Sequence, residues 1–194
     1  SVIRDAVGEL RTLGVLKTRK SVGLLVGEPD PIALFEKAFE ISTTQMMPLK
    51  DVAQLRYTLE IGSIDAAVKE ATAEEIAQLA DLAEQFADRA AHPSSEESHS
   101  VDSVDLAFHR MMLQCTHNDM IIRMHHVVTA YFGRISGEFN GWLANSVTDD
   151  HAIWQHRAIA AAFAKRNVEA ARSLLALHLA GLADEVEHAD NETS

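Results

Sequence analysis

The chain has 194 residues, enough for one well-buried domain with a small appendage. Leucine and alanine are plentiful, only 6% of the residues are aromatic and only four are proline, a composition that favours an α-helical bundle. The single cysteine, Cys115, excludes an intrachain disulfide, and no apolar run is long enough to span a bilayer. We therefore expect a cytoplasmic protein with no membrane partner.

The charge is unevenly distributed along the chain. The formal net charge is -12, yet residues 1–27 sum to +3, which leaves -15 on the other 167 residues. A basic N-terminal segment on an otherwise acidic chain is expected when only that segment contacts nucleic acid. From charge alone, chance clustering on a solvated surface is the other interpretation.

The N-terminal residues predict one helix and a small hairpin. Residues 2–13 have apolar side chains at helical spacing, and Gly14 follows as a C-terminal cap. Residues 15–19 and 23–26 predict two short strands around the turn Lys20-Ser21-Val22. A helix followed by a basic hairpin is typical of the end of a winged helix-turn-helix, whose helix enters the major groove. The alternative is a helix and hairpin that merely cap a bundle.

Two prolines in Glu28-Pro29-Asp30-Pro31 predict a linker, after which the helical period dominates. The spacing predicts helices over about 32–41 and 48–70, and the capping box Thr72-Ala-Glu-Glu75 begins another that ends near Ala91. We expect a surface loop at 94–100, followed by helices over about 101–116 and 118–139. Asn167 caps the last helix, whose acidic end from Asp184 is expected to fray.

Four side chains on these helices suggest a metal site. Asp105 and His109 lie one helical turn apart on the same face, and His156 and His178 each lie within an apolar stripe that faces inward. Burial of an unpaired carboxylate is costly, and a divalent metal would satisfy all four groups at once. A single inward-facing histidine is more often hydrogen-bonded packing, so the spacing alone leaves structural histidines as an equal alternative.

Several motifs resemble a known family. Arg56-Tyr-Thr-Leu-Glu60 resembles R-x-x-L-E, Asp105-Leu-Ala-Phe-His109 resembles D-x-x-F-H, and Thr116-His117-Asn118 precedes a long helix as in that family. The pattern, which covers about residues 30–188, resembles the C-terminal ligand-binding (FCD) domain of FadR-type regulators in the GntR family of transcription factors. The fold it implies is all-α, an antiparallel bundle of six or seven helices preceded by a partial winged helix-turn-helix.

The N-terminal part is similar to the same family but incomplete. Ile3-Arg4-Asp5-Ala6-Val7 resembles V-R-E-A-L of the recognition helix, and two earlier helices would precede Ser1. Gly8, Glu9 and the tip residues 21–24 depart from the family pattern and remove positive charge, so we expect weak DNA binding. The resemblance implies a partial DNA-binding domain at 1–27, a linker at 28–31, the FCD-like domain at 32–188 and a tail at 189–194. The DNA-binding candidates are Arg4, Arg19 and Lys20.

The resemblance also implies site residues and partners. It assigns a metal to Asp105, His109, His156 and His178, and a small carboxylate effector to Arg56 and, more weakly, Asn118, in a homodimer that binds operator DNA. Three nitrogens and one carboxylate suit zinc or nickel first and iron or manganese next, rather than calcium. The alternative for Arg56 is an ordinary surface salt bridge with Glu60, four residues on.

Three functions follow from these features. The first is a transcription regulator whose helical domain binds a divalent metal and a small carboxylate effector that modulates operator binding. The second is a metal-dependent helical-bundle enzyme acting on a small organic acid. No general base lies one turn from a ligand as in H-E-x-x-H, which counts against it. The third is a dimerising helical protein with structural histidines.

Overall fold

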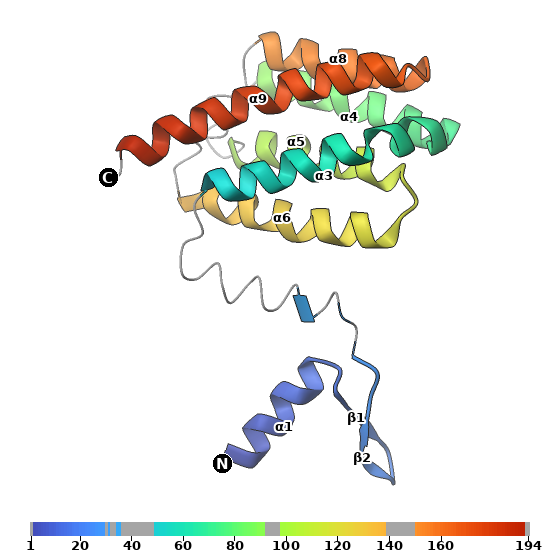
Figure 1. The fold of residues 1–194 in the computed structure, drawn as a ribbon, viewed down its shortest axis with the longest axis vertical. Coiled ribbons are helices and arrows are strands. Elements are labelled where there is room, and N and C mark those ends of the chain that lie inside the picture. The colour runs from blue at the N-terminus through green and yellow to red at the C-terminus, as the bar shows by residue number, and fades with distance from the viewer. Residues whose placement is uncertain are drawn as a thin grey trace. The chain divides into compact units, whose positions relative to one another are not determined.

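The computed structural model describes residues 2–29, 31, 34–35, 49–91, 98–138 and 150–192. The chain divides into two compact units, Ser1–Met46 and Met47–Ser194 (Figure 1). The linker predicted at residues 28–31 stays a prediction, and the helix predicted over 32–41 falls almost entirely outside the described residues.

The first unit contains helix α1 (Val2–Thr12) and the antiparallel strands β1 (Leu16–Arg19) and β2 (Gly23–Val26). Gly14 has a φ of +72°, the left-handed conformation expected of a C-terminal cap, and lets the chain turn from α1 into β1. In the hairpin Leu16 pairs with Val26 and Arg19 with Gly23. The predicted helix and hairpin are therefore confirmed.

The second unit is an all-α bundle, as predicted. Its helices within the described residues are α3 (Leu49–Glu70), α4 (Ala73–Ala91), α5 (Ser98–Gln114), α6 (Asp119–Glu138), α8 (Asp150–Ala164) and α9 (Val168–Glu192). Two local predictions were wrong. Helix α5 already begins at Ser98, within the expected loop, and α9 continues to Glu192 instead of fraying from Asp184. Once α9 is nucleated, each added residue gains a backbone hydrogen bond at little cost, which outweighs the local acidity.

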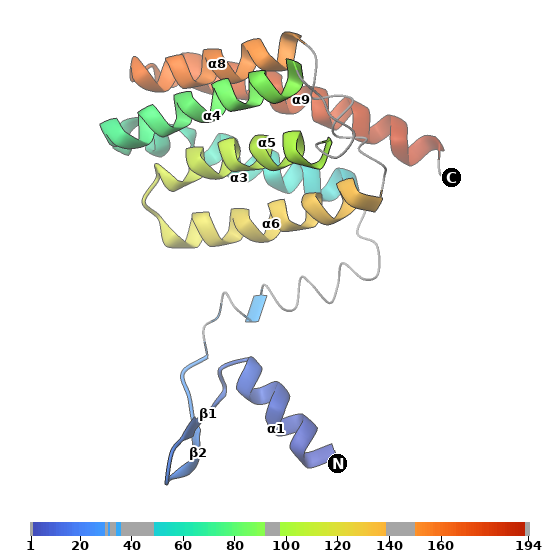
Figure 2. The same ribbon diagram turned by 180° about the vertical axis from the view of Figure 1, so that it is seen from behind.

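The helices of the second unit run side by side along one direction (Figures 1 and 2). Helix α3 packs against α9 and α5, and α5 also packs against α4. Helix α8 packs against both α4 and α9, so these five helices enclose a common interior. Helix α6 packs against both α3 and α5. Among the described residues, no helix is both long and apolar enough to cross a membrane.

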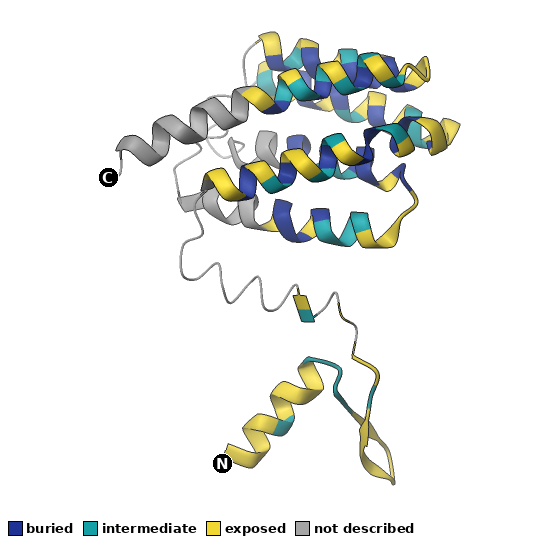
Figure 3. Cartoon of the chain, in the orientation of Figure 1, coloured by how far each residue is buried: buried dark blue, intermediate teal, exposed yellow. Residues whose placement is uncertain are grey.

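The buried residues lie on the helix faces that point into this interior (Figure 3). Large members of the core, each under 2% exposed, are Ile64, Leu79, Phe108, Met112, Ile159, Phe163 and Leu175. At about 25 cal/mol per Å², burial of such apolar surface is the main force that holds the helices together.

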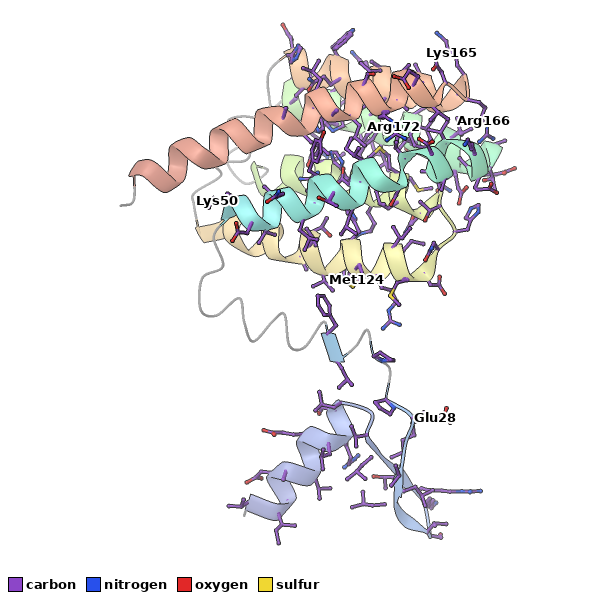
Figure 4. All side chains as sticks on the ribbon, in the orientation of Figure 1. Glu28, Lys50, Met124, Lys165, Arg166 and Arg172 are labelled. Carbon is purple, nitrogen blue, oxygen red and sulfur yellow. The ribbon has the colours of Figure 1, made fainter. Side chains whose placement is uncertain are left out.

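Polar side chains cap several helix ends. In the predicted capping box the Thr72 amide donates to Glu75 Oε2 at 2.7 Å, and the Glu75 amide donates to Thr72 Oγ1 at 3.2 Å. Arg166, labelled in Figure 4, donates to the carbonyl oxygens of Val68 and Ala71 at the end of α3. The Asn167 side chain accepts from the Ala170 amide and caps α9, as predicted.

Candidate metal centre

The four side chains predicted to bind a metal lie together in the interior of the second unit. One ligand atom from each of Asp105, His109, His156 and His178 lies within 4.8 Å of the others. Helix α5 supplies Asp105 and His109, which project from successive turns, while α8 supplies His156 and α9 supplies His178. The packing of three helices therefore brings together residues more than 70 positions apart.

The atoms that face one another are Asp105 Oδ1 and the Nε2 atoms of the histidines. Nε2 of His109 lies 3.0 Å from Nε2 of His178, and Asp105 Oδ1 lies 3.1 Å from His156 Nε2. Asp105 Oδ1 lies 3.6 Å from His109 Nε2 and 4.0 Å from His178 Nε2. Such separations are expected of atoms that share one ion at about 2.0–2.2 Å.

The cluster is buried, and His178 is its most exposed member. The side chains of His109 and His156 are 0% exposed, that of Asp105 is 5% exposed and that of His178 is 11% exposed. Phe86 of α4 stacks on the His156 ring with centroids 4.2 Å apart. His178 is therefore the least buried of the four side chains.

The second ring nitrogen of each histidine is held by a hydrogen-bond acceptor. His109 Nδ1 lies 2.6 Å from Glu60 Oε2, and His156 Nδ1 lies 2.8 Å from the Ala152 carbonyl oxygen. His178 Nδ1 lies 2.9 Å from Gln155 Oε1. Because these oxygens accept, Nδ1 donates in each ring, and a neutral ring then presents an unprotonated Nε2 to the cluster.

The arrangement therefore directs three nitrogen lone pairs and one carboxylate oxygen at a common point. When both rings are neutral, Nε2 of His109 and Nε2 of His178, 3.0 Å apart, have no hydrogen to share and repel each other. A cation between them removes that repulsion, and outer partners that hold Nδ1–H are typical of metal-binding histidines. The residues present fit a divalent transition metal, both in donor type and in tautomer.

Arg56 and Glu60 of α3 lie directly beside the cluster. Arg56 is 2% exposed, and its Nε donates to Glu60 Oε1 at 2.7 Å. Its Nη2 lies 3.6 Å from Asp105 Oδ2, the oxygen that does not face the histidines. The alternative interpretation of Arg56 was right about the partner, but the ion pair is buried rather than on the surface.

The electrostatics keep both buried carboxylates ionised. Burial alone would raise the pKa of Asp105, but His109, His156 and Arg56 outweigh it and hold that pKa well below 3.8. Burial is likewise opposed at Glu60, where His109, Arg56 and His125 keep the pKa well below 4.5. Asp105 therefore offers an ionised carboxylate to a cation.

Two of the histidines are shifted in opposite directions. Burial disfavours protonation of His109, yet Glu60 and Asp105 prevail and raise its pKa above 6.5. The pKa of His178 lies well below 6.5, because it is buried next to His156 and His109. His178 is therefore neutral at physiological pH, as a metal ligand must be.

Sequence reasoning missed the outer partners of the cluster. The motifs indicate Glu60 only as an ion-pair partner of Arg56, and they indicate neither Gln155 nor His125 of α6. His125 is 0% exposed, and its Nε2 donates to Glu60 Oε1 at 2.9 Å. Like His156, it lies between apolar residues at helical spacing, Ile121 and Val128, and this signal could have identified it.

Other predicted site residues lie elsewhere. Asn118 is exposed and caps α6, because its Oδ1 accepts from the amides of Met120 and Ile121. Its role as an effector contact stays a prediction. Arg4, Arg19 and Lys20 are exposed residues of the first unit, and their contact with DNA also stays a prediction.

Several solved structures have a similar fold. The GntR protein of Streptococcus agalactiae matches with a TM-score of 0.59 and 20% identity, covering 94% of this chain and 80% of its own. McbR/YncC of E. coli matches with a TM-score of 0.59 and 17% identity, covering 95% of this chain and 83% of its own. A GntR-family transcriptional regulator of Pseudomonas syringae pv. tomato matches with a TM-score of 0.60 and 17% identity, covering 98% and 70%.

The family is identified from the sequence of the second unit. No curated protein matches the chain. The model of the FCD domain matches residues 51–181, which include Arg56, Glu60 and the four clustered side chains. This match confirms the resemblance that the motifs suggested. The chain is a member of the FCD domain family, with the fold of GntR-type regulators.

Proposed function

We propose that this protein is a transcription regulator whose FCD domain binds a divalent metal and a small carboxylate effector. The observation that carries the proposal is the set of four donor atoms, Asp105 Oδ1 and three Nε2 atoms, that converge in a buried site. The regulators that share the fold support the DNA-binding part, which the helix and basic hairpin of the first unit would supply.

Asp105, His109, His156 and His178 would hold the metal, and zinc or nickel suits this donor set best. A bound divalent ion supplies positive charge that attracts a carboxylate. Arg56 supplies a second positive charge close by, since its Nη2 lies 3.6 Å from Asp105 Oδ2. Its planar guanidinium suits a carboxylate better than lysine would.

The effector would approach from the side of His178, the most exposed of the four ligands. A carboxylate that draws Arg56 away from Asp105 would disturb α3 and α5 together, because the Arg56–Asp105 pair joins these helices. A coupling of roughly 1 to 3 kcal/mol would change operator affinity about 5- to 150-fold. We further propose a homodimer, in which two recognition helices lie about 34 Å apart to read both half-sites.

The test combines metal analysis with DNA binding. Elemental analysis of the purified protein should find about one transition metal per chain, and Asp105→Asn should lower that content. Fluorescence anisotropy on DNA upstream of the protein's own gene should then change when small carboxylic acids are added. Arg56→Lys should weaken the response to the acid while metal content is retained.

Two results would contradict the proposal. Metal-free protein with the full response to acids would remove the metal from the mechanism. Turnover of an acid by the metal-loaded protein would favour the enzyme interpretation, which the regulators that share the fold do not support.

A further inference from the structure

Glu60 is a buried group that contacts the cluster without facing it. Its side chain is 0% exposed and accepts from three donors on three helices. Arg56 Nε of α3 and His125 Nε2 of α6 both donate to Oε1, at 2.7 and 2.9 Å. His109 Nδ1 of α5 donates to Oε2 at 2.6 Å.

These contacts determine which nitrogen of His109 carries its proton. An ionised carboxylate only accepts hydrogen bonds, so His109 must hold a proton on Nδ1. In the neutral ring Nε2 then has a free lone pair, and this atom faces Asp105 and His178. Exchange of the two nitrogens would leave Nδ1 and Glu60 in repulsion and would put a proton inside the cluster.

Glu60 also differs in kind from the partners of the other two histidines. His156 donates to a main-chain carbonyl and His178 to an amide oxygen, and both acceptors are neutral. Glu60 is charged, and its 2.6 Å contact with His109 is the shortest of the three. A charged acceptor draws the Nδ1 proton more strongly and makes the opposite nitrogen a better electron-pair donor.

We propose that Glu60 is a positioning residue of the metal centre. It fixes the tautomer and the ring orientation of His109 and strengthens Nε2 as a ligand, without touching the ion. The inference rests on the proposed function only in assuming that the cluster binds a metal.

Glu60→Gln is the matched substitution, since it keeps the size of the side chain and removes the charge. It would offer one acceptor oxygen in place of two and add N–H donors opposite groups that themselves donate. An amide N–H facing His109 would favour an unprotonated Nδ1, which places the proton on Nε2. The metal must then displace a proton that wild-type His109 does not hold there.

The test is a Zn²⁺ titration of the whole chain in competition with a chromogenic chelator. Glu60→Gln should bind Zn²⁺ about 10- to 100-fold more weakly than wild type. Glu84→Gln is the control, because Glu84 also binds an arginine, Arg157, but is 58% exposed on α4. This variant should keep wild-type affinity, and equal affinity of Glu60→Gln and wild type would overturn the proposal.

A second measurement uses the wild-type protein and needs no variant to fold. Nitrogen NMR of the metal-free protein at a pH where His109 is neutral should show its proton on Nδ1, and Nε2 should be the nitrogen that shifts when Zn²⁺ is added. A proton on Nε2 would overturn the proposal. A wild-type protein that binds no Zn²⁺ would refute the proposed function and this inference with it, whereas normal binding by Glu60→Gln would refute this inference alone.

Discussion

Replacement of His178 by glutamine removes one of the four donor atoms at the most exposed edge of the cluster. In the metal-free protein the loss of stability is small, because only the contacts of His178 with Gln155 and with His109 are removed. In the metal-loaded protein the loss of stability is larger, because the ion keeps only three of its protein ligands. We therefore expect the variant to lose stability chiefly when metal is present.

The size of the effect follows from mass action. At free Zn²⁺ of about 100 times Kd, binding stabilises the wild-type fold by about 2.7 kcal/mol. A variant with roughly 100-fold weaker affinity gains only about 0.4 kcal/mol at the same concentration. The difference of about 2.3 kcal/mol corresponds to about 5 to 9 °C in melting temperature for a chain of this length.

Differential scanning calorimetry with and without Zn²⁺ measures both states. The control is His126→Gln, which replaces an exposed histidine of α6 and should keep the wild-type response to metal. A His178→Gln protein that retains the whole Zn²⁺-induced rise in melting temperature would refute the idea that the four donors share one ion.

Three further predictions concern pH, a helix cap and the thiol. Burial opposes protonation of His109, but Glu60 raises its pKa above 6.5. The Zn²⁺ affinity, measured by calorimetry, should therefore fall about tenfold for each pH unit below that raised pKa. An affinity that does not change with pH would contradict this prediction. In metal-free protein the raised pKa of His109 also stabilises the fold. This stabilisation is complete below pH 6.5 and is lost as pH rises through the raised pKa. Thr72→Ala should lower the free energy of unfolding in urea by about 1 kcal/mol, while Thr72→Ser should change it little. Burial, aided by Glu75, raises the pKa of the Cys115 thiol to about 12, so iodoacetamide at pH 8 should label it far more slowly in the native protein than in urea.

The sequence by itself determined the local structure of this protein. Helical spacing, the Thr72–Glu75 capping box and the cap at Gly14 act within a few residues, so they could be predicted without knowledge of the fold. The one-turn spacing of Asp105 and His109 is equally local. The apolar stripes around His156 and His178 indicated only that both face inward.

Only the tertiary structure decided which groups meet in the interior. The contact of His109 with Glu60 joins residues 49 positions apart, and that of His178 with Gln155 joins different helices. The motif indicated that Arg56 can pair with Glu60, but not that this pair is buried against Asp105. The physical reason is that the period of a helix selects its buried face, whereas the axial position of each helix against its neighbours is set by packing of side chains distant in sequence.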